Sequence, residues 1–327
     1  MSRKILRFVL GIAALLPAVV FLGQSKLASA ADKLRVGKTV ATSFSYVPLD
    51  VGLSQGIFQR EGLDIEEINF TGAAPMEAAM IADSLDIGLG ASAMIAHLVK
   101  GSPETAVAVS VITMANLGLM IAYDSPLKTI DDLKGKNIGI TTVGSLSDLL
   151  VRMLNSNKGW GKDSAKAIAI GSSMSGMMAA LKIHSVDAIV GDVGLVFEFE
   201  DAKEARLLAP VSSYAGNFPR EIISATNKKL KEDPDVVRRF VKAWFESIAF
   251  MKTHKAETVT TGSKVEELKI PYEERMYELA ISMFSDTGRF ESSDLKALSR
   301  SFVEMGLLPT EVDLTPFYTE AYLPRAK

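Results

Sequence analysis

Hydroxyl-bearing side chains gather in three short segments, each directly after a run of apolar residues. The segments are residues 39–46 (TVATSFSY), 90–94 (GASAM) and 141–147 (TTVGSLS). The second and third segments open helical patterns, so their free backbone N–H groups carry a partial positive charge. Such N–H groups, together with hydroxyls, can bind a carboxylate, sulfonate or phosphate group without a buried Lys or Arg. The segments therefore predict a site for a small anion.

Ser92 and Ser145 have a second interpretation. Each stands where an N-capping residue is expected, and a cap is the commoner role for any one of these segments alone. Binding is favoured because several segments fall at one edge of a sheet, where open α/β sheets bind ligands. Phe44 and Tyr46 could pack against an organic part of the ligand. An organic sulfonate or carboxylate therefore fits better than bare nitrate.

Two charged residues outside these segments complete the candidate site. Asp192, in the sequence GDVG at 191–194, could accept a hydrogen bond from a ligand amine or hydroxyl, or could be an ordinary turn residue. Arg220 could instead supply the counter-charge for an anion. The candidate ligand-binding residues are Thr42, Ser43, Phe44, Tyr46, Ala91, Ser92, Asn116, Thr142, Gly144, Ser145, Ser147, Asp192 and Arg220.

Sequence motifs for catalysis and for metal binding are absent. There is no G-x-S-x-G, H-E-x-x-H or G-x-x-x-x-G-K-[ST] pattern. The chain has no Cys, and its three His residues lie far apart, at 97, 184 and 254. A formal net charge of −3 gives no footprint for binding nucleic acid. The residues therefore predict no catalytic, cofactor, metal or nucleic-acid site.

The first 30 residues are typical of a secretory signal peptide. A basic start precedes an apolar run at 8–22 and the small-residue sequence ASA at 28–30. The run is about 15 residues, short of the ~20 that span a bilayer, so a retained membrane anchor is the less favoured alternative. The leader holds four basic and no acidic residues, so its removal takes the net charge from −3 to −7. We expect cleavage after Ala30 and a mature protein in the periplasm.

From residue 34 to about 223, short apolar runs alternate with helical patterns. This alternation predicts an α/β fold with mainly parallel sheets covered by helices on both faces. The expected strands are 34–40, 63–70, 87–90, 107–112, 119–123, 137–142, 165–170 and 188–190. The expected helices are 48–60, 74–82, 92–100, 145–155 and 174–183, with a capped turn that begins at Thr129.

The pattern changes after residue 227. Segments 234–253, 272–284 and 292–305 each place apolar residues at helical spacing. The stripe of the first segment consists of Val237, Phe240, Val241, Trp244, Phe245, Ile248 and Met251. Aromatic residues in such a stripe are far more often core than part of a cofactor site. We expect a C-terminal helical segment that packs back onto the α/β part.

An internal repeat is visible at an offset of 101 residues. Residues 76–90 read MEAAMIADSLDIGLG and residues 177–191 read MMAALKIHSVDAIVG. Each copy predicts a helix, a turn, an Asp and a short buried strand. The similarity could be that of any two αβ units, but it favours two related lobes. His184, which takes the place of Asp83, is expected at the surface.

Several motifs give the chain a resemblance to a known family. They are LRVG at 34–37, GIF at 56–58, EGLDI at 61–65, DIG at 86–88, DLKGK at 132–136 and VDA at 186–188. Over about residues 34–260 the chain resembles periplasmic substrate-binding proteins of ABC importers. The resemblance is to the branch that binds nitrate, sulfonates and taurine and that includes binders of pyrimidine precursors. The family usually has Gly where this chain has Ser84 and Ser185.

The resemblance implies an α/β, two-lobed periplasmic binding protein fold of type II, or venus flytrap. Lobe one would hold residues 31–124 and the C-terminal segment 216–327, and lobe two residues 125–215. Crossovers near 123–126 and 212–219 would act as hinges. Ligand would bind between the lobes and favour the closed form. The implied partners are a small-molecule ligand and the permease and ATPase of an inner-membrane importer. The protein would be a monomer and would not be an enzyme.

Two other functions stay open as alternatives. The same fold could serve a periplasmic sensor that presents its ligand to a receptor. The same superfamily contains a pyrimidine-precursor synthase that relies on a Cys-rich iron motif, which a chain without Cys does not have. A pyrimidine precursor is also the remote alternative to a sulfonate or carboxylate as ligand.

Overall fold

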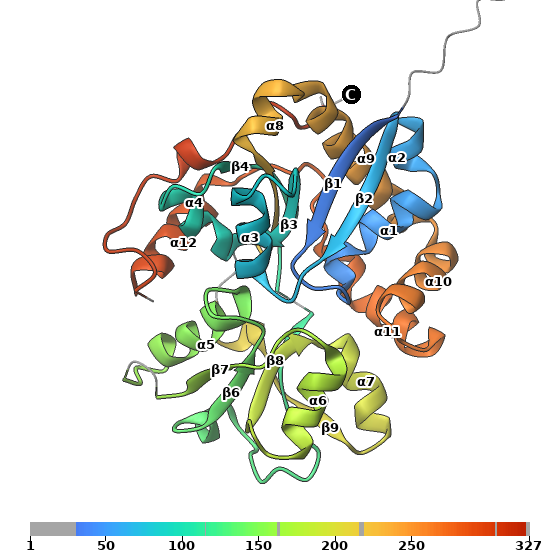
Figure 1. The fold of residues 1–327 in the computed structure, drawn as a ribbon. Helices are drawn as coiled ribbons and strands as arrows, with labels where there is room; N and C mark the ends of the chain where they lie inside the picture. Colours follow the sequence, from blue (N-terminus) through green and yellow to red (C-terminus); the bar gives the residue numbers. More distant parts are fainter. Residues whose placement is uncertain (1–30, 115, 162–163, 216–218, 305, 325–327) are drawn as a thin grey trace, which may run out of the picture. The chain divides into compact units, whose positions relative to one another are not determined.

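The structure is a computed structural model that describes residues 31–114, 116–161, 164–215, 219–304 and 306–324. The predicted signal peptide lies outside these residues, as does the last residue of the helix expected at 292–305. The described part contains two five-stranded sheets, each flanked by helices (Figure 1). The predicted α/β fold is confirmed.

The first sheet combines strands from both ends of the described chain. Its strands are β1 (Asp32–Lys38), β2 (Leu63–Asn69), β3 (Ile87–Ala91), β4 (Glu104–Val111) and β10 (Glu221–Thr226). They lie in the order β2-β1-β3-β10-β4. β1 pairs in parallel with β2 and β3, whereas β10 runs antiparallel to both β3 and β4. The last strand therefore returns from the second sheet to fill an interior position.

The second sheet repeats this plan. Its strands are β5 (Leu117–Ala122), β6 (Asn137–Ile140), β7 (Lys166–Ala169), β8 (Ala188–Asp192) and β9 (Ala205–Pro210). They lie in the order β7-β6-β8-β5-β9, with β5 antiparallel to β8 and β9. The prediction of mainly parallel sheets holds in both, since four of the five strands run in one direction.

The sheet pairing corrects the expected place of the first crossover. The strand expected at 119–123 was grouped with lobe one, but β5 pairs within the second sheet. The chain thus crosses between Val111 and Leu117, before β5 rather than after it. Every residue of β5 is buried, and such a continuous apolar run contains no signal for the sheet in which it lies. The return crossover falls between Pro210 and Glu221, where it was expected.

The helices follow the predicted order with two kinds of difference. The single helix expected at 48–60 is two helices, because Gly56 adopts a left-handed φ of 65° that interrupts the helical backbone. Strands β9 and β10 and helices α7, α8 and α10 were not anticipated. The helices are α1 (Val47–Ser54), α2 (Ile57–Arg60), α3 (Ala73–Ile81), α4 (Ile95–Val99), α5 (Leu146–Asn157), α6 (Met174–Lys182), α7 (Gly194–Asp201), α8 (Asn227–Glu232), α9 (Pro234–Thr253), α10 (Lys255–Val265), α11 (Ile270–Ala280) and α12 (Ser292–Glu304).

Helix α9 carries the predicted apolar stripe into the core of the first sheet. Phe240 and Trp244 are fully buried, and Phe240 stacks on Phe58 of α2 with ring centroids 5.4 Å apart. The Trp244 indole N–H donates to Ser110 Oγ of β4 at 3.1 Å. Phe245 departs from the expectation, because it is only half-buried. The C-terminal helices thus pack on the first sheet, as expected.

Helix α11 also contacts the helix that follows β8. Tyr272 donates from its hydroxyl to Asp201 Oδ2 at 3.0 Å, and Lys269 pairs with Glu198. The guanidinium of Arg275 lies over the Phe197 ring, 3.9 Å from its centroid. The C-terminal helices therefore connect the two sheets beyond the crossovers.

The internal repeat is visible in the hydrogen bonds of the two sheets. Asp86 Oδ2 accepts from the backbone N–H of Arg35 in β1 at 2.9 Å, and Asp187 Oδ2 accepts from that of Asn137 in β6 at 2.8 Å. The turn before each Asp contains a non-glycine residue with positive φ, Asp83 at 56° and the exposed His184 at 54°. The repeat is confirmed.

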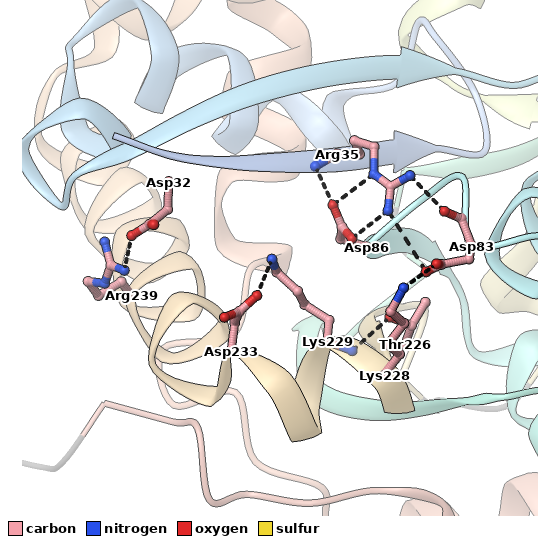
Figure 2. Close-up of polar contacts among 9 residues, drawn as sticks. All are labelled: Asp32, Arg35, Asp83, Asp86, Thr226, Lys228, Lys229, Asp233 and Arg239. Carbon is pink, nitrogen blue, oxygen red and sulfur yellow. Dashed lines mark hydrogen bonds and ion pairs between the residues drawn. The ribbon is translucent and has the colours of Figure 1, made fainter. Parts of the chain in front are cut away.

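Figure 2 shows the first copy of this motif. Arg35 adds two side-chain hydrogen bonds to Asp86 and one to the Asp83 carbonyl, and Lys228 of α8 donates to Asp83. The Arg35 side chain thus ties β1 to the turn before β3. Asp86 directly precedes β3, so this polar cluster lies at the amino-terminal end of that strand.

Candidate functional site

A cavity of about 90 Å³ is lined by residues from the segments that follow the strands of both sheets. The first sheet contributes Thr39 and Tyr46, which follow β1, and Glu221, which begins β10. The second contributes Ser145, at the start of α5, and Asp192, at the end of β8. The cavity therefore lies where the carboxyl ends of parallel strands face one another, the usual place for a ligand in an open α/β sheet.

Most of the predicted site residues line this cavity. Those that do are Thr42, Ser43, Tyr46, Ala91, Ser145, Ser147, Asp192 and Arg220. Those that do not are Phe44, Ser92, Asn116, Thr142 and Gly144. The geometry thus brings together residues from five separate segments of the sequence.

Phe44 faces away from the cavity. It opens a 3-10 turn (Phe44–Tyr46), in which successive side chains point in different directions. The Phe44 ring is fully buried and lies 5.8 Å from the Phe284 ring, whereas the Tyr46 hydroxyl reaches the cavity wall. Of the two aromatic residues expected to pack against a ligand, Tyr46 alone is placed to do so.

The other residues outside the lining have local roles. Asn116 is buried directly behind Asp192 and donates to its Oδ1 at 2.5 Å. Gly144 has a φ of 80°, and its N–H donates to Asp148 Oδ2. The Thr142 side chain packs against Gly72, and Ser92 is buried with its hydroxyl unpaired among the described residues.

Asp192 and Arg220 form the charged floor of the cavity. Arg220 Nη2 donates to Asp192 Oδ1 at 3.2 Å, and Nη1 donates to Asn116 Oδ1 at 2.5 Å. Ser43 Oγ donates to Asp192 Oδ2 at 2.8 Å. Burial opposes the charge of Arg220, but the carboxylates of Asp192 and Glu221 outweigh it and raise the Arg220 pKa. The guanidinium is therefore charged and already paired.

Glu221 and Tyr46 form a second polar group beside it. The Tyr46 hydroxyl donates to Glu221 Oε2 at 2.9 Å and lies 2.7 Å from Thr39 Oγ1. Burial is the main cause that raises the pKa of Glu221 to about 7 and the pKa of Tyr46 above its usual value. Neither Glu221 nor Thr39 was among the candidate residues, although Thr39 begins the predicted segment 39–46. Glu221 begins β10, a strand that the sequence pattern did not indicate, so no local signal marked it.

The N-terminus of α5 supplies hydroxyls, as predicted, but also a carboxylate. Ser145 is the N-cap, and its Oγ accepts from the Asp148 N–H at 3.4 Å. Ser147 Oγ lies 2.9 Å from Ser145 Oγ and accepts from the Thr141 N–H at 2.9 Å. Asp148 accepts from the Gly144 N–H at 2.8 Å and pairs with Arg152. The Asp148 carboxylate therefore already accepts one of the backbone N–H groups that a bound anion could use at the start of α5.

The described residues contain no group of three or more His, Cys, Asp or Glu side chains placed to hold a metal ion. Among the same residues, no helix has the length and apolar character needed to cross a membrane. Besides these polar groups, the apolar side chains of Leu146, Leu150, Met177 and Val190 line the cavity. The arrangement suits capture of a small solute with one polar end and a short apolar body.

Comparison with known families identifies the family of the chain. The family model described as NMT1/THI5 like matches residues 43–258. The chain belongs to this NMT1/THI5-like family. The matched segment starts at Ser43 and contains every cavity-lining residue named above except Thr39 and Thr42.

Relatives of this NMT1/THI5-like chain include binding proteins and an enzyme. YtlA of Bacillus subtilis (strain 168), named as a binding protein, is 24% identical over 242 residues, which are 72% of this chain and 70% of YtlA. The 4-amino-5-hydroxymethyl-2-methylpyrimidine phosphate synthase of Candida albicans (strain WO-1) is 21% identical over 291 residues, 85% of this chain and 84% of the synthase.

Solved structures identify the fold. The alkanesulfonate-binding protein SsuA from Xanthomonas axonopodis pv. citri, bound to MOPS, superposes with a TM-score of 0.76 at 18% identity. The superposition covers 89% of this chain and 99% of SsuA. The NMT1/THI5-like chain has the periplasmic binding protein fold, as its sequence motifs implied.

Proposed function

We propose that the protein is the periplasmic solute-binding component of an ABC importer. It captures a small organic molecule between its two sheets and delivers it to a membrane permease, which a separate ATPase drives. The cavity between Tyr46 and Glu221 on one side and Ser145 and Asp192 on the other supports this proposal. A ligand there contacts both sheets at once, and it therefore favours the closed form over an open one.

The described cavity residues suit binding rather than catalysis. Ser43 is hydrogen-bonded to Asp192, but no His or Lys side chain lines the cavity to act as a base for it. The one guanidinium, Arg220, is held by Asp192 and Asn116. We infer that the protein forms and breaks no bond in its cargo.

The sequence predicted a sulfonate or carboxylate as cargo. The hydroxyls of Ser145 and Ser147 at the start of α5 support an anion. The carboxylates of Asp192 and Glu221 in the same cavity oppose it. The cargo is therefore best sought in a panel that contains anions, zwitterions, neutral amides and cations of similar size.

A thermal-shift screen of the mature protein, unfolded and refolded to remove carried-over ligand, tests the proposal. A solute at about 100 times its Kd stabilises the fold by about 2.7 kcal/mol, which raises Tm visibly. We expect at least one solute to stabilise the wild type and to lose affinity for Ser147→Ala. Ser156→Ala, on the exposed face of the same helix, is the matched control. If no solute in the panel or in a periplasmic extract raises Tm, the proposed function is wrong.

A further inference from the structure

The charges that line the cavity are unbalanced. Besides the Tyr46 phenol, its ionisable lining residues are Asp192, Glu221 and Arg220, two acids and one base. All three are buried. With both acids ionised the wall has one negative charge in excess, and charge imbalance is costly where water is excluded. A ligand that brings a second negative charge would add to this cost.

Both terminal nitrogens of Arg220 are already paired. Its Nη1 donates to Asn116, and its Nη2 lies 3.2 Å and 3.5 Å from the two Asp192 oxygens. Its Nε lies 3.4 Å from Glu221 Oε1. The Nε–H has no hydrogen-bond acceptor, but a carboxylate or sulfonate that reached it would lie beside the buried Glu221 carboxylate, which repels it.

Glu221, in contrast, retains capacity to accept hydrogen bonds. Its Oε2 accepts one hydrogen bond, from the Tyr46 hydroxyl at 2.9 Å. Its Oε1 lies 3.4 Å from Arg220 Nε and forms an ion pair with it. The two atoms do not form a hydrogen bond, so Oε1 accepts none from Arg220. A carboxylate offers about four lone-pair positions, so Glu221 can accept further N–H groups. Burial raises the pKa of Glu221 to about 7, because Arg220 and the Tyr46 hydrogen bond only partly offset it.

From these contacts we infer that the cavity selects a small ligand whose polar end is an N–H donor, a protonated amine or amidine or a neutral amide, directed at Glu221. This inference rests on the proposed function and replaces the anion expected from the sequence. A volume of about 90 Å³ holds roughly six to nine water-sized groups. The body of the ligand is therefore a short aliphatic group that packs against Leu146, Leu150 and Met177.

Three ligands of nearly identical shape test the inference: isobutyramidine, isobutyramide and isobutyrate. They differ in charge, which is positive, neutral and negative, but share the branched apolar body. Binding to the refolded mature protein is measured by isothermal titration calorimetry. We expect the amidine and the amide to bind at least tenfold more tightly than isobutyrate.

Variants of Glu221 test whether this residue causes the preference for N–H donors. Glu221→Gln keeps the shape of the side chain but removes its charge, so the amidine should lose at least tenfold in affinity and the amide less. Glu66→Gln, an exposed acid on β2, is the matched control and should change neither. Circular dichroism verifies that each variant is folded. If Glu221→Gln does not fold, Tyr46→Phe replaces it. This variant removes the hydrogen bond from Tyr46 to Glu221, and it should change the preference for the amidine and the amide over isobutyrate.

The outcomes separate this inference from the proposed function. If isobutyrate binds as tightly as the amidine, or if anions of the wider panel bind while N–H donors do not, the inference is wrong but solute binding stands. If an N–H donor of the panel binds and its anionic analogue does not, the inference is supported even when isobutyramidine itself is too small to bind. If nothing in the panel or a periplasmic extract binds, both are wrong.

Discussion

Ser43 and Asp192, which are 149 positions apart in the sequence, share a hydrogen bond of 2.8 Å between Ser43 Oγ and Asp192 Oδ2. Ser43 belongs to the segment after β1 of the first sheet, and Asp192 ends β8 of the second. The bond joins the two sheets beside the cavity. It can therefore form only when the segment after β1 and the end of β8 lie within hydrogen-bond distance of each other. The same carboxylate accepts from Asn116 and Arg220, one on each crossover.

Removal of the Ser43 hydroxyl should weaken ligand binding without unfolding the protein. A hydrogen bond to a charged group contributes about 1.5–3 kcal/mol, so Ser43→Ala should raise the Kd of any ligand found by screening about tenfold or more. Calorimetry measures the Kd, and a denaturation curve should show little loss of stability. Ser54→Ala, exposed at the end of α1, is the control. An unchanged Kd for Ser43→Ala would mean that the bond persists in the open form.

Glu266 and Glu273 predict a stability that depends on pH. Both side chains are buried, and burial is the main cause that raises the pKa of each, to about 7 for Glu273. The mutual repulsion of the two carboxylates and the nearby charge of Asp192 raise the Glu266 pKa further, while Arg220 opposes this rise. The folded state thus binds more protons than the unfolded state above the ordinary Glu pKa. Stability from this pair is present at low pH and falls as the pH rises through about 7.

Substitution of Glu273 by Gln should remove that dependence. At about pH 8 the variant loses a buried negative charge and should gain about 1–3 kcal/mol of unfolding free energy over the wild type. At about pH 5 the difference should be small, because the wild-type pair is protonated there. Urea denaturation at both pH values measures it, with the exposed Glu274→Gln on the same helix as control. A variant that is less stable than the wild type at both pH values would contradict the assignment.

The repeated Asp residues should differ in what their removal costs. Asp86 accepts from the Arg35 backbone and from two guanidinium nitrogens, whereas Asp187 accepts from the Asn137 backbone and lies 3.7 Å from Lys136. We expect Asp86→Ala to lose about 2–4 kcal/mol and Asp187→Ala about 1–2 kcal/mol of unfolding free energy. Urea denaturation of the two variants side by side gives the order. Equal losses would show that the Arg35 side chain adds nothing to the strand contact.

Local sequence patterns predicted those parts of the site that depend on local structure. Ser145 was expected to open a helix, and it does cap α5, because a cap is a relation between residues three apart. The repeat was visible because each copy is one continuous helix, turn and strand. The stripe on α9 was likewise correct for Phe240 and Trp244, since helical spacing alone defines it.

Long-range pairing accounts for what the sequence did not reveal. Glu221 was missed because β10 takes its place between β3 and β4 through partners more than 100 positions away. The strand β5 was assigned to the wrong sheet for the same reason. Phe44 and Tyr46 looked equivalent in the sequence, but the 3-10 turn sends one ring to the core and the other to the cavity. Charge compensation of Arg220 also appears only when Asp192 and Asn116 are brought to it.

Gly72 and Thr142 make a second contact between the two sheets, and it predicts that a single methyl group will impair closure. Gly72 precedes α3 with a φ of 132°, and a Cβ built on it would lie 2.5 Å from Thr142 Oγ1. Gly72→Ala should therefore hold the two segments apart and weaken ligand binding about tenfold or more, in addition to the strain of about 1–3 kcal/mol that a side chain brings to such a backbone.

Gly101→Ala distinguishes the effect of backbone strain from that of a steric clash with Thr142. Gly101 also has a positive φ, 98°, but a Cβ there would meet nothing within 4 Å. Both variants should lose stability in a urea denaturation, whereas only Gly72→Ala should lose ligand affinity in calorimetry. Thr142→Gly, added to Gly72→Ala, removes the obstructing side chain and should restore most of that affinity but not the stability. If Gly101→Ala weakens binding as much as Gly72→Ala, backbone strain rather than contact between the segments is the cause.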